Sequence, residues 1–262
     1  MRRTTLRGTD NFPIGIIGGT GGMGRWFADF FEKEGHPVLV SGRDRGARPA
    51  EMAGACPVVI VSVPIGATQD VIRQVGPCMK RESLLMDLTS LKAGPVRAML
   101  ESSASEVIGL HPLFGPSVLR LEGQNIVICP ARGGKWLPWV RDVFGRKGAK
   151  LVEATPERHD EIMAVVQALN HLDTIVMGLA IRQSGLEREI RESFSTPILR
   201  GKLGMIDRIF SNPQLHTELI TANPHTARVL RLYREVLDRV GEVAVKGSAA
   251  DLAAALRRSA PG

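Results

Sequence analysis

Cysteine is scarce in this sequence of 262 residues, which has only three, at Cys56, Cys78 and Cys129. An odd number with no C-x-x-C spacing argues against a disulfide framework, so a reducing cytoplasm is the expected compartment. No cluster of His, Cys and Asp has the spacing of a metal site, and we therefore expect no bound metal.

Long apolar runs are also missing. No run approaches the roughly 18 consecutive apolar residues that a membrane span needs. Asp10 and Pro13 interrupt the stretch after the basic start Met1-Arg2-Arg3, so a cleavable signal peptide is not expected. The chain is 44% hydrophobic and 23% charged, which is typical of globular proteins. These features predict no membrane partner. With 262 residues, the chain is also long enough to bury a core.

Aromatic residues are few, with one Tyr, three Trp and eight Phe, although the net charge is 34 − 27 = +7. The basic residues are scattered and interrupted by acids or glycines. Nucleic-acid binding usually combines clustered cations with aromatic rings that stack on bases. We therefore expect no nucleic-acid partner, and small anionic ligands explain the positive charge at least as well.

The first part of the chain alternates strand-like apolar runs with helical patterns. The pattern predicts strands at Pro13–Ile17, Pro37–Val40, Val58–Val63, Ser83–Leu88, Val107–Leu110, Asn125–Cys129 and Ala149–Glu153. Helices are expected over Gly22–Gly35, Thr68–Val75, Gly94–Leu100 and Leu137–Arg146. Such alternation is typical of βαβ units, and it predicts a Rossmann-type α/β domain over residues 1–154 with a mostly parallel sheet.

After residue 154 the sequence pattern changes from alternating strands and helices to helices alone. Thr155-Pro156-Glu157 has the features of a helix start, and the apolar periodicity that follows continues to about Arg182. Further helices are predicted over Pro197–Phe210, Pro213–Thr221, Pro224–Val245 and Ala249–Arg258. Residues 155–262 are therefore expected to form an all-α domain.

A glycine-rich segment lies between the first predicted strand and helix. It contains G-x-G-x-x-G at Gly19, Gly21 and Gly24, and its remaining members are Thr20, Gly22 and Met23. Tight glycine turns at a helix N-terminus let the backbone approach a pyrophosphate. The context predicts a dinucleotide site, whereas a plain glycine turn is the alternative.

The end of the second strand indicates which dinucleotide binds. Ser41 stands where an NAD site usually has an acid, and Arg43 and Arg45 follow it. A small hydroxyl followed by guanidinium groups suits a 2′-phosphate, which favours NADP over NAD. Asp44 keeps the NAD alternative open, because it could contact the ribose instead.

Three further strand ends carry residues that could take part in the chemistry, and they would gather at one edge of a parallel sheet. Val63 and Pro64 end the third strand and could border a nicotinamide. Ser90 and Lys92 follow the fourth strand. The alternative for Lys92 is a purely structural role in bracing the loop. His111 ends the fifth, and a histidine there is suited to proton transfer near neutral pH.

With these segments in this order, the sequence resembles the prephenate/arogenate dehydrogenase family of tyrosine biosynthesis. The resemblance covers nearly the whole chain, and its most specific segment is Gly109-Leu-His-Pro-Leu-Phe-Gly-Pro116. The other matching segments are the glycine loop, Val61–Pro64, Asp87–Lys92, Arg158–Asp160, Val166–His171 and Met205–Phe210. The resemblance implies a monofunctional enzyme, because about a dozen residues precede the first strand of the Rossmann-type domain and no regulatory domain follows the helices.

The resemblance also implies a reaction and roles for particular residues. The family oxidatively decarboxylates a cyclohexadienyl acid, with hydride passing from ring C4 to the nicotinamide and CO2 leaving C1. It implies that His111 takes the 4-hydroxyl proton, with Ser90 hydrogen-bonded beside it. Arg208 would bind the ring carboxylate, His171 the substrate side chain, and Ser117 would affect selectivity. The resemblance further implies that residues 155–262 bind the substrate and form a homodimer, with the active site between the two domains.

Several alternatives remain open. The same scaffold could act on 4-amino-4-deoxyprephenate, and a non-catalytic nucleotide-binding redox sensor would bind nucleotide without turnover. Arg208 could be a solvated face residue of its amphipathic helix, and His171 could belong to a core network. His159 and His171 lie about 120° apart around a helix, so they are not expected to share one ligand.

Overall fold

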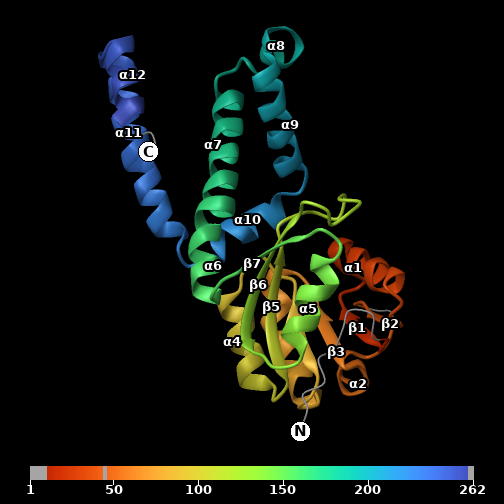
Figure 1. Ribbon diagram of the computed structural model, residues 1–262. Coiled ribbons are helices and arrows are strands. Elements are labelled where there is room, and N and C mark those ends of the chain that lie inside the picture. The colour runs from red at the N-terminus through yellow and green to blue at the C-terminus, as the bar shows by residue number, and fades with distance from the viewer. Residues whose placement is uncertain (1–10, 44–45, 259–262) are drawn as a thin grey trace. The chain divides into compact units, whose positions relative to one another are not determined.

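The alternation seen in the sequence produces a single sheet of seven strands in the order β2-β1-β3-β4-β5-β6-β7 (Figure 1). The computed structural model describes residues 11–43 and 46–258. The strands are β1 (Ile14–Ile17), β2 (Val38–Ser41), β3 (Val58–Val61), β4 (Leu84–Asp87), β5 (Glu106–Pro112), β6 (Asn125–Arg132) and β7 (Lys150–Glu153). All seven predicted strands are confirmed. Every pairing is parallel except that of β5 with β6, so the sheet is mostly parallel, as predicted.

Helices cover both faces of the sheet. They are α1 (Gly22–Lys33), α2 (Pro49–Ala55), α3 (Ile65–Val75), α4 (Ala93–Ser102) and α5 (Trp136–Gly145), with a 3-10 turn at Gly76–Cys78. Alternate residues of β1 point to opposite faces: Ile14 and Ile16 pack with α1 and α5, whereas Ile17 packs with α2, α3 and α4. Burial on both faces explains why the strands are continuous apolar runs. Helix α2 escaped prediction because its seven residues are mostly Ala, Gly and Pro without clear periodicity.

The chain divides into two compact units, unit 1 (residues 1–160) and unit 2 (residues 161–262). Unit 2 is helical, and α6 (Pro156–Met163) runs across the division. Its other segments are η2 (Ala164–Leu169), α7 (Asn170–Gln183), α8 (Glu187–Glu189), η3 (Ile190–Phe194), α9 (Pro197–Ser211), α10 (Pro213–Thr221), α11 (Thr226–Lys246) and α12 (Ala249–Arg258). The predicted long helix is present, but η2 is a π-helical segment within it.

The composite helix from Pro156 to Gln183 is long and apolar enough to cross a membrane by length and composition alone. Counting consecutive apolar residues did not reveal it, because polar residues such as Gln167 and Asp173 interrupt the run. About a quarter of its most apolar window is buried, 28%. The exposed remainder includes Val165, Val176 and Leu179, so much of this apolar surface lacks a partner within the described chain.

Candidate active site

The glycine-rich turn joins β1 to α1. Gly18 has φ of +83°, and a Cβ there would lie 2.2 Å from the carbonyl oxygen of Ser62. A Cβ at Gly24 would lie 2.3 Å from the carbonyl oxygen of Gly18, so neither position admits a side chain. The N–H groups at the start of α1, including those of Gly22 and Met23, have no acceptor within the helix. Such a helix end is suited to a phosphate group, and the turn therefore fits a dinucleotide pyrophosphate.

A pocket of about 670 Å³ lies beside this turn. Its lining residues are Gly19, Thr20, Arg25, Ala28, Asp29, Glu32, Val40, Gly42 and Arg43. The Nε of Arg25 donates to the carbonyl oxygen of Thr20 at 2.7 Å, which fixes a guanidinium group at the rim. Two arginines and two carboxylates thus surround the space that follows β2. Arg25 was missed because its position on α1 alone does not show which way it faces.

Ser41 and Arg43 have different places at the end of β2. Ser41 is buried and does not line the pocket, while its carbonyl oxygen accepts the N–H groups of Gly18 and Gly19 at 2.8 and 3.0 Å. Arg43 is exposed and lines the pocket. Asp44 and Arg45 lie outside the described residues. Of the two described side chains, Ser41 and Arg43, the one that a nucleotide could contact is therefore Arg43.

The carboxyl ends of the parallel strands form one row across the sheet. Ile17 pairs in register with Val61, Val61 with Asp87, and Asp87 with Gly109. His111 follows Gly109 on β5 and therefore lies at the same edge as the glycine-rich turn. Ligands of such sheets bind outside this edge, so the edge is the candidate active site of unit 1.

His111 belongs to a chain of three buried polar side chains. Its Nδ1 lies 2.8 Å from Nε2 of His159, and Nδ1 of His159 lies 2.8 Å from Oδ1 of Asp160. The exposed fractions of the three residues are 3%, 1% and 2%. A carboxylate only accepts hydrogen bonds, so Nδ1 of His159 donates to Asp160. In neutral His159 this leaves Nε2 to accept from His111, whose own Nε2 then carries the lone pair.

Asp160 is anchored by helix α4. Its Oδ1 accepts the backbone N–H of Lys92 at 2.7 Å, and its Oδ2 accepts that of Ala93 at 2.9 Å. A helix N-terminus favours a negative charge, because its backbone N–H groups are unpaired and its dipole is positive there. The same carboxylate therefore caps α4 and orients His159.

Burial lowers the pKa of His111 well below its ordinary value, and electrostatic interactions with His159 and Lys92 lower it further. His111 is therefore neutral at physiological pH. A neutral imidazole can accept a proton, which is what a general base must do.

Lys92 lies beneath this group as half of a buried ion pair. Its side chain is fully buried, and Nζ donates to Oδ2 of Asp87 and to the carbonyl oxygen of Leu110 at 2.9 Å. The same Asp87 oxygen accepts from the backbone N–H of Thr89 at 3.1 Å and from its hydroxyl group. Lys92 thus connects β4 to Leu110, the residue that precedes His111. Its contacts therefore extend beyond the loop in which it lies.

The other candidates of unit 1 lie on loops at the same edge. Ser90 is half-buried after β4, but its hydroxyl makes no hydrogen bond to His111 within the described chain, and His159 occupies Nδ1 of that ring. Val63 is half-buried, and Pro64 is exposed before α3. Ser117 is exposed in the loop between β5 and β6.

The candidates of unit 2 form a second cluster. His171 of α7 and His216 of α10 are half-buried, with ring centroids 4.7 Å apart. Burial lowers the pKa of both rings; His216 further lowers that of His171, and Arg208 lowers that of His216. Arg208 itself is an exposed residue of α9. Nδ1 of His216 is buried and has no hydrogen-bond partner within the described ranges.

Sequence reasoning missed three members of these groups, namely His159, Asp160 and His216. The Arg158-His-Asp160 segment contributed to the family resemblance, but nothing in the spacing indicated that His159 contacts a strand 48 residues earlier. Among residues 11–43 and 46–258, no group of three or more His, Cys, Asp or Glu could hold a metal ion.

Two family models match the chain. The prephenate dehydrogenase nucleotide-binding domain matches residues 29–153, and the prephenate dehydrogenase dimerization domain matches residues 155–258. These matches contain both histidine groups but begin after the glycine-rich turn.

Individual relatives agree with the models. A probable arogenate/prephenate dehydrogenase from Methanocaldococcus jannaschii is 34% identical over 253 residues, covering 89% of this chain but only 57% of the relative. A 4-amino-4-deoxyprephenate dehydrogenase from Streptomyces pristinaespiralis is 25% identical, with 91% and 87% covered. Prephenate dehydrogenase from Aquifex aeolicus, solved with hydroxyphenyl propionate and NAD+, shares the fold at a TM-score of 0.73 and 17% identity, with 98% and 97% covered. Because both family models match in order along the chain, this protein belongs to the prephenate dehydrogenase family.

Proposed function

We propose that this protein is an NAD(P)-dependent oxidoreductase that oxidatively decarboxylates prephenate or arogenate, with a preference for NADP. The observation that carries the proposal is the buried chain of His111, His159 and Asp160 at the carboxyl edge of the sheet. It supplies a neutral, oriented base at the same edge of the sheet as a turn that fits a dinucleotide. A redox sensor without turnover would have no use for such a base.

His111 acts as the general base of the proposed reaction. Its Nε2 accepts the proton of the substrate 4-hydroxyl group as carbonyl character develops at C4. The positive charge that forms on the imidazole of His111 is stabilised through His159 by the carboxylate of Asp160. When bound, the nicotinamide supplies the acceptor for the hydride that leaves C4, while loss of CO2 from C1 makes the ring aromatic.

Prephenate and arogenate each carry two carboxylates, and the candidates that would bind these groups are cations and hydrogen-bond donors. Arg208 binds the ring carboxylate in this proposal, because a guanidinium group matches a carboxylate in shape and charge. His171 contacts the substrate side chain, and we add His216 because its ring packs on His171. Ser90 binds the 4-hydroxyl group, and Ser117 contributes to selectivity.

The nucleotide-binding residues are those of the turn and the pocket beside it. The proposed pyrophosphate ligands are the backbone groups of Gly19, Thr20, Gly21, Gly22, Met23 and Gly24. Arg43 and Arg25 would bind a 2′-phosphate, which favours NADP. Ser41 contributes by placing no acid at the end of β2, and Val63 and Pro64 would border the nicotinamide.

The protein is proposed to be a cytoplasmic homodimer joined through its helical part. Helix α11 is strongly amphipathic, yet none of its residues is buried. Leu232, Val236 and Val240 are among its exposed apolar residues. A second copy of the chain would cover this apolar surface, as the name of the matching dimerization domain suggests.

One assay tests the proposed function. Purified protein is incubated with prephenate, arogenate or 4-amino-4-deoxyprephenate, each with NADP and with NAD, while reduced nucleotide is followed by absorbance. Turnover of prephenate or arogenate is expected. Exclusive turnover of the amino compound would instead support the second candidate, which the 87% coverage of the Streptomyces relative favours. No turnover of any of the three would refute both.

A further inference from the structure

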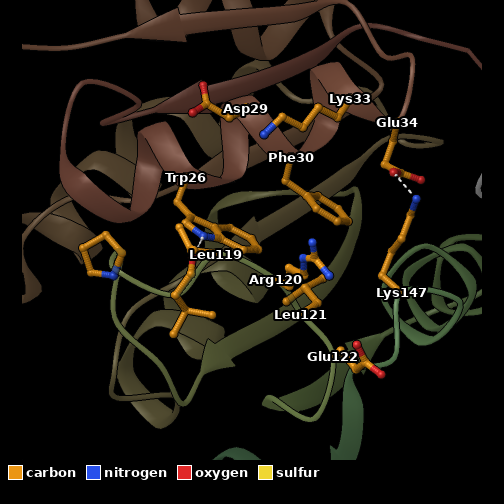
Figure 2. A pocket seen from close by; sticks show the side chains of 12 residues that line it. Trp26, Asp29, Phe30, Lys33, Glu34, Leu119, Arg120, Leu121, Glu122 and Lys147 are labelled. Carbon is orange, nitrogen blue, oxygen red and sulfur yellow. Dashed lines mark hydrogen bonds and ion pairs between the residues drawn. The ribbon is translucent and has the colours of Figure 1, made fainter.

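Trp26 links the nucleotide-binding helix to the loop that follows His111. The loop comprises residues 113–124, between β5 and β6, and is called the 113–124 loop below. The indole Nε1 of Trp26 donates to the carbonyl oxygen of Val118 at 2.6 Å. Its ring packs edge-on against Phe114 at 5.2 Å and parallel to Phe30 at 5.7 Å. Figure 2 shows Trp26 and Phe30 of α1 facing Leu119 and Leu121 of the loop.

The loop is fastened at its two ends by its own strands. The N–H of Leu113 donates to the carbonyl oxygen of Asn125 at 2.9 Å, and Leu121 is buried in the core. Between these anchors, Ser117 and Leu119 are exposed, Leu119 by 94%. The N–H of Val118 donates to the carbonyl oxygen of Gly115 at 3.1 Å, which closes a local turn but does not fix where that turn lies. The position of this middle part therefore depends on contacts with another element.

Those contacts come from the end of α1 that fits a phosphate. A Cβ at Gly22 would lie 3.1 Å from Cγ of Pro116, so the loop rests against the first turn of the helix. Trp26 lies one turn further along α1 and holds Phe114 and Val118. Ser117 lies between two residues that α1 contacts, while the loop begins directly after β5, which carries His111.

The hydrogen bond of Trp26 distinguishes it from a simple packing residue. Trp139 is fully buried in the core, whereas its Nε1 has no hydrogen-bond partner within the described residues. Trp26 is only partly buried and makes a short bond across 92 positions of sequence. The bond fixes the direction of the Val118 carbonyl and hence the backbone next to Ser117.

We propose that Trp26 is a positioning residue that fastens the 113–124 loop to the phosphate-binding end of α1, so that nucleotide binding prepares the loop for the substrate. The role of Ser117 in this inference rests on the proposed function. A ligand that steadies α1 would also steady the loop, and by reciprocity the substrate would tighten nucleotide binding. The coupling requires no movement larger than the ordering of the loop.

The test compares Trp26→Phe with the matched control Trp139→Phe, using hydrogen exchange and kinetics on the full chain. Trp26→Phe keeps an aromatic ring but removes the N–H donor, whereas Trp139→Phe removes an indole N–H without a partner. In the wild type, saturating NADP should slow exchange in both residues 18–24 and residues 113–124. In Trp26→Phe, protection of 18–24 should remain while that of 113–124 falls at least threefold.

The substrate KM should rise about three- to tenfold in Trp26→Phe, as expected for one lost hydrogen bond, with kcat and the NADP Kd measured alone within twofold. A merely structural Trp26 would lower the melting temperature but leave the KM and the loop protection as in Trp139→Phe, and that result would overturn the inference. If Trp26→Phe does not fold, Phe114→Leu tests the same contact from the loop side. The exchange measurement needs no turnover, so it separates failure of this inference from failure of the proposed function.

Discussion

Two histidine pairs, one in each unit, have similar geometry and different surroundings. The rings of His111 and His159 lie 5.0 Å apart at 69°, and those of His171 and His216 lie 4.7 Å apart at 75°. The first pair is buried and anchored to Asp160, whereas the second is half-buried beside the cation Arg208. Ring geometry alone therefore does not assign a role to a histidine pair. A fixed carboxylate suits one pair to proton transfer, and a neighbouring cation suits the other to anion binding.

Replacement of the proposed base, His111, should have the largest effect. His111→Asn is expected to lower kcat by about 10²–10⁴, the usual contribution of general base catalysis, while the nucleotide Kd stays unchanged. Steady-state kinetics and nucleotide titration measure the two quantities. The matched change His171→Asn should act mainly on KM, and a kcat within threefold of wild type in His111→Asn would remove His111 from the mechanism.

Asp160→Asn should lower kcat by about a hundredfold, because an amide can present a donor to His159 and reverse the order of hydrogen bonds toward His111. The substrate KM should change less than threefold. Glu157→Gln, at an exposed position of the same helix, serves as the control and should leave both parameters unchanged. Equal effects of the two substitutions would contradict the orienting role of Asp160.

Arg208→Ala should raise the substrate KM about thirtyfold, which corresponds to roughly 2 kcal/mol for loss of one partner of a charge pair. The change should appear in KM more than in kcat, because the carboxylate is charged before the reaction begins. Lys202→Ala removes another exposed cation of α9 and is the control. An unchanged KM in Arg208→Ala would make Arg208 a solvated surface residue.

Arg43→Ala should lower the ratio of kcat/KM for NADP to that for NAD by about tenfold, as expected for one charge-assisted hydrogen bond to phosphate. Arg48→Ala, which removes an exposed arginine paired with Glu51, should not change the ratio. A wild type that prefers NAD tenfold would refute the proposed nucleotide preference but not the proposed reaction.

The smallest effect concerns pH. The pKa values of His171 and His216 are lowered, so both rings gain charge only as the pH falls below about 6.5, the ordinary value. Because an anionic substrate favours the charged rings, KM should fall about threefold between pH 7 and pH 5. The kcat should hold over this range, since the pKa of His111 is lowered further. A KM independent of pH, or a kcat that falls already at pH 7, would contradict this assignment.

Local patterns were sufficient for the sheet, since apolar runs identified each of its seven strands, but they did not reveal the short helix α2 or the π-helical segment η2. They also identified His111, because a strand end specifies the edge at which a residue lies. They could not identify His159, because the pattern of α6 gives a helix face but not the element that packs against it. Likewise, Ser41 marked the correct strand end, but only the three-dimensional packing distinguishes its buried side chain from the exposed Arg43.

The buried pair of Lys92 and Asp87 constrains how this sequence can evolve. Loss of either partner alone would leave an uncompensated charge inside the sheet, at a cost of about 3–5 kcal/mol. That is a large share of the roughly 5–15 kcal/mol that stabilises an ordinary domain. A lineage can therefore leave this pair only by changing both positions together. We expect it to persist in descendants whose exposed residues, such as Ser117 and Arg43, have drifted toward other substrates and nucleotides.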